Sequence, residues 1–127
     1  MKPMTSASSS PETSQKVSLS GSAENPPITS QGSASGTVNV RPDRTVSAEI
    51  TVTGINSTIA HIHEAKVGAN GPVILPLTKV GDNRYVAPEG AKLTESQYAA
   101  YKAGNTYVNV HSAKFPGGEL RAQLAGH

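Results

Sequence analysis

The chain has 127 residues, no cysteine and a formal net charge of +2, which results from 11 basic and 9 acidic residues. This length predicts one domain with a modest core, and the lack of cysteine excludes disulfides, zinc–thiolate sites and thiol nucleophiles. The basic residues are scattered, the chain contains one Phe and no Trp, and no apolar run is long, so the composition argues against nucleic-acid binding and membrane insertion.

Residues 1–15 form a polar tract rich in Ser, Thr and Pro, with Met1 and Met4 as its only large apolar residues. Such a composition cannot offset the entropy lost on ordering by burying apolar surface. We therefore interpret residues 1–15 as a disordered leader and residues 16–127 as the folded β domain. A tether behind a cleaved signal or a membrane anchor and a vector-derived start are both compatible with this tract.

From Val17 onward, apolar and polar residues alternate with a period of two, which predicts short strands with one buried face. The predicted strands contain Val17 and Leu19, Val38 and Val40, residues 46–52, residues 58–63, Tyr85 and Val86, residues 107–111, and residues 119–124. Residues 73–77 are also apolar, but Pro76 confines this run to a sheet edge or an extended loop because proline cannot donate a backbone hydrogen bond.

A single short helix is predicted over residues 95–103. Thr94 and Gln97 have the spacing of a capping box, in which Thr is the N-cap and Gln reaches back to it. Gly104 supplies the expected C-cap, and we expect the two tyrosines of the helix to pack on a sheet. The strands and the turn residues between them predict an all-β fold, a Greek-key β-sandwich or barrel with one short connecting helix.

Three of the four histidines fall on the polar faces of predicted strands. His61 and His63 are two residues apart in one strand, so alternation places both imidazoles on one face, about 7 Å apart at the backbone. In a later strand, two valines take the core face and leave His111 on the opposite face. If these two strands are neighbours in a sheet, the three rings meet at one point.

Three imidazoles suit copper, zinc, nickel or iron, and copper has the highest intrinsic affinity of these ions. We therefore predict a site for one copper ion at His61, His63 and His111, with Asn109 or loop carbonyls orienting the rings. Because the rings bind metal in their neutral form, binding should weaken below about pH 6. The alternative interpretation is three surface histidines that share no ligand.

The fourth ligand of such a site is left open. Water, His127 at the C-terminus or, less favourably, Met4 in the leader would complete it. Glu64 directly follows His63, but strand alternation turns it to the other face, so we interpret Glu64 as structural.

The segments AHIHEAKVGANGPVILPL, residues 60–77, and LTESQYAAYKAGNTYVNVHSAKFPGGELRAQL, residues 93–124, resemble the chordin-type (CHRD) domain. The resemblance extends over most of residues 17–125. Bacterial members of this family are usually exported, which implies a periplasmic or extracellular location. In animals the domain is repeated in a secreted antagonist of bone morphogenetic proteins.

The histidine strands are also similar to the copper strands of Cu,Zn superoxide dismutase, which is a Greek-key β-barrel. This resemblance implies that His61 and His63 are paired copper ligands, that His111 is the late-strand ligand, and that Arg121 guides the anionic substrate. Arg121 shares the outward face of its strand with two polar residues, so an ordinary surface ion pair is the alternative. The chain lacks cysteine and has no histidine between Glu64 and Tyr107, so the resemblance implies a copper-only site without zinc.

These observations favour a copper-binding protein of the bacterial envelope that acts in copper handling or resistance, and a binding protein rather than an enzyme. The first alternative is a copper-only, dismutase-like redox enzyme with Arg121 at its site. The second alternative is a protein-interaction module without metal, for which residues 73–77 are the candidate apolar edge. An envelope protein and a second copy of the chain are the candidate macromolecular partners.

Overall fold

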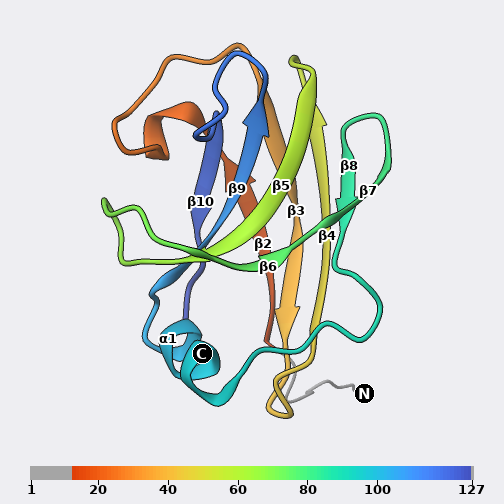
Figure 1. Cartoon of the computed structure of the whole chain (residues 1–127), viewed down its shortest axis with the longest axis vertical. Coiled ribbons are helices and arrows are strands. Elements are labelled where there is room, and N and C mark those ends of the chain that lie inside the picture. Colours follow the sequence, from red (N-terminus) through yellow and green to blue (C-terminus); the bar gives the residue numbers. More distant parts are fainter. Residues whose placement is uncertain (1–12, 127) are drawn as a thin grey trace, which may run out of the picture.

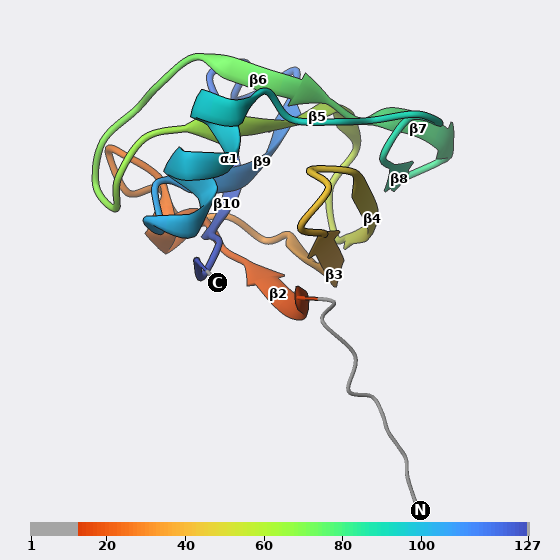
Figure 2. The same ribbon diagram turned by 90° about the horizontal axis from the view of Figure 1, so that it is seen from below.

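The computed structural model describes residues 13–126, which form two antiparallel sheets packed face to face (Figures 1 and 2). The first sheet has the order β10 (Leu120–Gln123), β9 (Thr106–Ser112), β5 (Ser57–Glu64) and β6 (Val73–Pro76). The second has the order β2 (Thr13–Leu19), β3 (Ser33–Val40), β4 (Val46–Thr53), β8 (Arg84–Val86) and β7 (Thr78–Gly81). A 3-10 turn, η1 (Gly21–Ala23), and a helix, α1 (Glu95–Lys102), complete the regular structure. The predicted all-β sandwich with one short connecting helix is confirmed within these residues.

The core lies between the two sheets and is built from the apolar positions of the alternating strands. In β4, for example, Val46, Ile50 and Val52 are buried, whereas the residues between them are exposed or half-buried. The first sheet contributes Ala60 and Ile62 from β5, Val108 and Val110 from β9, and Leu120 and Ala122 from β10. Removal of this apolar surface from water, at about 25 cal/mol per Å², is the main force that holds the sheets together.

Two connections between the sheets bring the histidine strands side by side. β4 leads into β5 of the opposite sheet, and the long connection from β8 through α1 returns the chain to β9. β9 pairs with β5 in an antiparallel register that places His63 opposite Tyr107 and His111 opposite Ile59. The neighbouring strands that a shared histidine site requires are therefore present.

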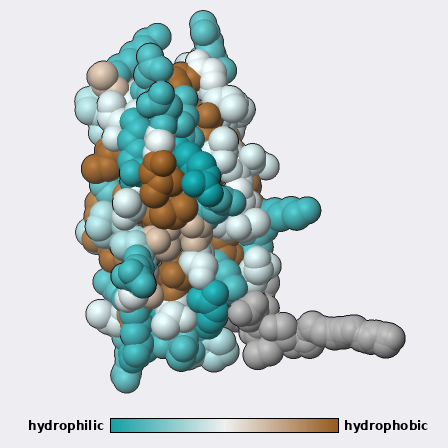
Figure 3. Space-filling model, turned by 90° about the vertical axis from the view of Figure 1, so that its right-hand side faces the viewer, coloured by the Kyte–Doolittle hydropathy of each residue, from teal (hydrophilic) through white to brown (hydrophobic). Residues whose placement is uncertain are grey.

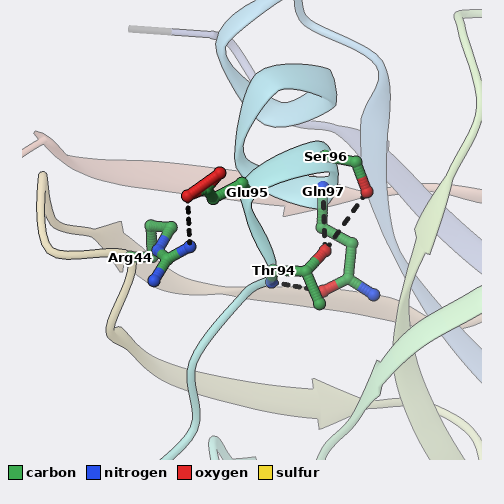
Figure 4. A network of polar contacts seen from close by, with 5 residues as sticks. All are labelled: Arg44, Thr94, Glu95, Ser96 and Gln97. Carbon is green, nitrogen blue, oxygen red and sulfur yellow. Dashed lines mark hydrogen bonds and ion pairs between the residues drawn. The ribbon is translucent and has the colours of Figure 1, made fainter.

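The helix α1 begins with the predicted capping box (Figure 4). The Gln97 N–H donates to Thr94 Oγ1 at 3.1 Å, and the Thr94 N–H donates to Gln97 Oε1 at 2.8 Å. The C-cap is Ala103, and Gly104 follows it with a left-handed φ of 81°. As predicted, the tyrosines of the helix face the sandwich, since one is buried in the core and the other packs against it.

β2 begins at Thr13, so residues 13–15 belong to the second sheet rather than to the leader that the composition predicts. The Gln15 side chain attaches this end of the strand, because its Nε2 donates to Tyr101 Oη at 3.1 Å and to the Ala125 carbonyl at 3.0 Å. Polar composition gave no sign of this attachment, since its acceptors lie more than 80 residues further along the chain.

Of the edge strands β6 and β7, the sequence predicted only β6. β6 ends at Pro76 and is an edge strand of the first sheet, as predicted. The edge strand β7 was not predicted, because its four residues are all exposed and show no alternation of burial.

Among residues 13–126, no helix is long and apolar enough to cross a bilayer. The rest of the predicted leader, residues 1–12 with Met4, and the candidate ligand His127 lie outside the described residues.

The outer face of the first sheet is covered by connecting segments. All seven residues of β9 are buried, so this strand is packed on both faces. The β5–β6 loop, residues 65–72, lies across β9, since the Gly71 N–H donates to Tyr107 Oη at 3.1 Å. The connection between β2 and β3 covers the same face from the other side, where η1 packs against β10. The outer face therefore carries a second, polar layer of buried side chains.

Candidate metal centre

Three imidazole rings meet in this polar layer. His61 and His63 come from β5 and His111 comes from β9, and their candidate ligand nitrogens all lie within 4.8 Å of one another. The ring centroids are 5.4 Å apart for His61 and His63, 4.8 Å for His61 and His111, and 5.8 Å for His63 and His111. The pairing of β5 with β9 thus brings together the three rings that strand alternation places on one face.

Backbone carbonyls fix the tautomers of two of the rings. His63 Nδ1 lies 2.9 Å from the Gly71 carbonyl oxygen, and His111 Nδ1 lies 3.0 Å from the Pro116 carbonyl oxygen. Because a carbonyl oxygen only accepts hydrogen bonds, each Nδ1 carries the proton in the neutral ring and each Nε2 carries a lone pair. Both rings therefore have a basic nitrogen available as a ligand.

One pair of ring nitrogens already has the spacing expected of two ligands of a single ion. His61 Nδ1 lies 3.1 Å from His111 Nε2, and two nitrogens at about 2.05 Å from one tetrahedral metal ion lie about 3.3 Å apart. His63 Nε2 is buried and has no hydrogen-bond partner among the described residues. An unsatisfied buried polar atom is destabilising, and an ion bound at the cluster would supply the partner that this atom lacks. The donor set and its unpaired nitrogen therefore fit a metal ion.

The rings are held in the neutral form that binds metal. Burial, followed by the charges of His111 and His63, lowers the pKa of His61 to about 4. Burial is also the main cause that lowers the pKa of His63 and the pKa of His111, and the carbonyl contacts of their Nδ1 atoms partly oppose it. A metal ion at neutral pH therefore does not have to displace protons from imidazolium rings.

Acidification of the metal-free protein should destabilise the fold between about pH 6.5 and pH 4. Folding lowers the pKa of His61 from 6.5 to about 4, so in this range the unfolded chain binds a proton that the native state does not. The stabilisation is complete above pH 6.5 and is lost as the pH falls toward 4. Thermal unfolding with a chelator at about pH 7.5, 5.5 and 4.5 should show a falling melting temperature, and a weaker pH dependence in His61→Gln. An equal pH dependence in both proteins would contradict this assignment.

Arg121 is buried, and its interpretation as a surface ion pair is wrong. The residue is 1% exposed. Its guanidinium donates to the Ala69 carbonyl at 2.8 Å, the Lys66 carbonyl at 3.2 Å, Asn70 Oδ1 at 3.3 Å and Gln123 Oε1 at 3.0 Å. Strand alternation correctly places Arg121 on the outer face of β10. The β5–β6 loop folds over that face, and its carbonyl oxygens accept hydrogen bonds from the guanidinium.

Tyr107 lies between Arg121 and the histidines. Its ring stacks on His63 with centroids 4.8 Å apart and 5° between the planes, and the Arg121 guanidinium carbon lies 3.6 Å from the Tyr107 ring centroid. A cation over an aromatic face is attracted to the ring. Alternation along residues 107–111 places Tyr107 on the same face as His111 but does not indicate the stack. A prediction of the stack would have needed the β5–β9 register, in which Tyr107 and His63 are cross-strand partners.

Of the two predicted orienting groups, loop carbonyls contact two of the histidine rings, whereas the hydrogen bonds of Asn109 Nδ2 within residues 13–126 go to other groups. Asn109 Nδ2 donates to Glu24 Oε2 at 2.6 Å and to the Leu120 carbonyl at 2.9 Å. Burial raises the pKa of Glu24, against the effects of the Asn109 hydrogen bond and the Arg121 charge. Sequence reasoning missed Glu24, because a lone acidic residue in a connection carries no pattern.

Of the remaining candidate ligands, the structure describes only Glu64, which does not join the cluster. Glu64 ends β5, is half-buried, and is not among the clustered ligands in the part of the chain that the structure describes. This placement agrees with its interpretation as structural. The contribution of His127 stays a prediction.

The fold and the site define a class of protein: a two-sheet β-sandwich that carries three converging histidines on the covered face of one sheet. A family profile of the CHRD domain matches residues 15–124, and the chain belongs to this family. CHRD domains occur in extracellular or secreted proteins. No curated protein and no solved structure matches the chain, so the resemblance to superoxide dismutase gains no support from relatives.

Proposed function

We propose that this chain is an exported copper-binding protein that holds one copper ion with His61, His63 and His111 and acts in copper handling or resistance in the bacterial envelope. The observation that carries the proposal is the convergence of three ligand nitrogens within 4.8 Å, together with the buried and unpaired His63 Nε2. Unrelated surface histidines would not leave a buried nitrogen unpaired, since this costs about 1–3 kcal/mol.

The donor set favours copper over other ions. Imidazole nitrogen suits copper, zinc and nickel, and copper has the highest intrinsic affinity of the divalent ions in this series. Cysteine, which would favour a zinc–thiolate site or an iron–sulfur cluster, is absent from the chain. When bound, copper would supply one-electron chemistry or a store of the ion for transfer to a partner.

Each ring has a defined part in binding. His63 and His111 carry their protons on Nδ1, so neither ring has to change its tautomer to bind through Nε2. His61 donates its Nδ1 proton to His111 Nε2, so it would move that proton to Nε2 in order to bind through Nδ1. His61 is also the half-buried member of the cluster, whereas the other two are buried. The ion would therefore exchange with solvent on the side of His61.

The position of Arg121 favours binding over dismutase-like catalysis. An arginine that guides an anionic substrate has to face the path along which the substrate arrives. The Arg121 guanidinium is instead covered by carbonyl oxygens of the β5–β6 loop, and the Tyr107 ring contacts both this guanidinium and the His63 ring. The Arg121 guanidinium therefore stabilises the β5–β6 loop and does not face an incoming substrate.

An interaction module without metal would need a continuous apolar surface. Among the described residues, the exposed large apolar side chains are Ile59, Val67, Val73 and Val80, which lie in different segments of the chain. On the side of the molecule next to β7 and β8, hydrophilic groups interrupt the apolar ones (Figure 3). The outer edges of β6 and β7 are the candidate contact for an envelope protein or a second copy of the chain.

Calorimetric titration of the metal-free protein with copper tests the proposed function. We expect His61→Ala, His63→Ala and His111→Ala each to weaken copper binding by more than about 100-fold, which exceeds the loss caused by changes beyond the ligands themselves. A parallel titration with zinc should give weaker binding. Unchanged copper affinity in all three variants would reject the proposal.

His127→Ala is the matched control, because it removes the only other imidazole of the chain and leaves the cluster intact. Copper affinity equal to that of the wild type would show that the three strand histidines are sufficient. A clear loss would identify His127 as the fourth ligand.

A further inference from the structure

One backbone residue, Gly71, joins the histidine cluster to Tyr107. Its carbonyl oxygen accepts the hydrogen bond from His63 Nδ1 at 2.9 Å, and its N–H donates to Tyr107 Oη at 3.1 Å. His63 and Tyr107 are cross-strand partners in β5 and β9, and their rings are stacked. Two side chains on a rigid sheet therefore hold the same loop residue, one through its carbonyl and one through its N–H.

Gly71 has little freedom to move away from these partners. A Cβ on residue 71 would lie 1.8 Å from the Glu64 carbonyl oxygen, so the loop backbone lies directly against β5. The Glu64 N–H also donates to the Pro72 carbonyl at 3.0 Å. Arg121 fixes the preceding part of the loop through two further carbonyls. These contacts hold the loop on both sides of residue 71, and the Tyr107 hydroxyl is the hydrogen-bond partner of the Gly71 N–H itself.

The direction of the Gly71 carbonyl decides which nitrogen of His63 carries the proton. While the Gly71 carbonyl faces Nδ1, the Nδ1–H tautomer is favoured and Nε2 keeps its lone pair. If the carbonyl turned away, Nε2–H would compete, and the buried Nε2 would lose its capacity to bind an ion. The Tyr107 hydroxyl is the acceptor that holds the Gly71 N–H, and through it the peptide geometry at residue 71.

We propose that Tyr107 is a positioning residue for the metal ligand His63, and that it acts through Gly71 by keeping His63 in the Nδ1–H tautomer. Its role toward the metal rests on the proposed function, whereas its effect on the tautomer is a property of the metal-free protein. Groups that orient a ligand in this way typically contribute about 10- to 100-fold to metal affinity.

Tyr107→Phe tests the proposal, because it removes the hydroxyl and retains the ring that stacks on His63. Tyr85→Phe is the matched control. Tyr85 is 0% exposed and its hydroxyl donates to Ser57 Oγ at 2.8 Å, so this variant also loses one buried tyrosine hydrogen bond but does not change the contacts of Gly71. Long-range proton–nitrogen NMR of the metal-free proteins reports the tautomer of each histidine ring, and copper titration reports the affinity.

We expect the Nδ1–H tautomer of His63 in the wild type and in Tyr85→Phe, and a mixture of tautomers in Tyr107→Phe. Copper affinity should fall by about tenfold or more in Tyr107→Phe and stay within about twofold in Tyr85→Phe. An Nε2–H tautomer in the wild type, an unchanged tautomer in Tyr107→Phe, or equal changes in both variants would overturn the inference. Absence of copper binding in the wild type would instead overturn the proposed function, and the tautomer measurement would still decide whether Tyr107 sets the state of His63.

Discussion

Replacement of Arg121 by methionine is expected to lower the free energy of unfolding by about 3 kcal/mol, because several buried hydrogen bonds are lost together. The guanidinium donates to two loop carbonyls and two side-chain oxygens, and it also covers the Tyr107 ring. Methionine fills part of the volume but donates no hydrogen bond. The melting temperature should fall by on the order of 10 °C for a domain of this size.

Two further variants separate the causes of this loss. Arg84→Met removes an exposed arginine whose partner is Glu49, and it should change stability by less than about 1 kcal/mol. Arg121→Lys keeps the charge but lacks the planar fork of donors, so it should recover only a minor part of the loss. Chemical denaturation of the metal-free proteins measures all three, and equal stabilities of Arg121→Met and Arg84→Met would show that the buried contacts contribute little.

Gly71→Ala should destabilise the fold by about 2 kcal/mol or more, since the new methyl group has no space. The added Cβ would lie 1.8 Å from the Glu64 carbonyl oxygen and 3.0 Å from Ala65 Cβ, so the loop has to move away from β5. This movement would break the hydrogen bond from His63 Nδ1. Copper affinity should therefore fall by about 10- to 100-fold, even though no ligand is replaced.

Gly117→Ala is the corresponding control in the loop that serves His111. A Cβ on residue 117 would meet no atom within 4 Å among residues 13–126, and Gly117 directly follows Pro116, whose carbonyl oxygen lies near His111 Nδ1. We expect its stability to stay within about 0.5 kcal/mol of the wild type. Thermal unfolding and copper titration of both variants check the pair, and a similar loss in both would argue against a specific role for the space at Gly71.

The faces of the strands could be predicted from the sequence because alternation is a local signal. It separated Ile62 from the histidines of β5 and Val110 from His111 in β9, and the residues on the core side are buried in the core as expected. The capping box of α1 was equally local, since Thr94 and Gln97 are three residues apart. Whether the two histidine strands are neighbours depended on the crossover connections, for which the resemblance to a known family was the only guide.

The cover of the outer face could not be predicted, because it consists of loops. Alternation indicates that Arg121 points away from the core, but it cannot distinguish solvent from a loop that folds back over the sheet. The β5–β6 loop reaches Arg121 and Tyr107 mainly through backbone groups, and backbone contacts leave little trace in residue identity. The orienting role of the Gly71 carbonyl was missed for the same reason.

The distance along the chain between His63 and His111 also bears on when a metal can be acquired. A growing chain that ends before β9 carries only His61 and His63 of the cluster, and the third ring comes with one of the last strands. The complete site arises only when β9 docks beside β5. Under the proposed function, loading of the three-ring site with metal would therefore follow folding of the domain.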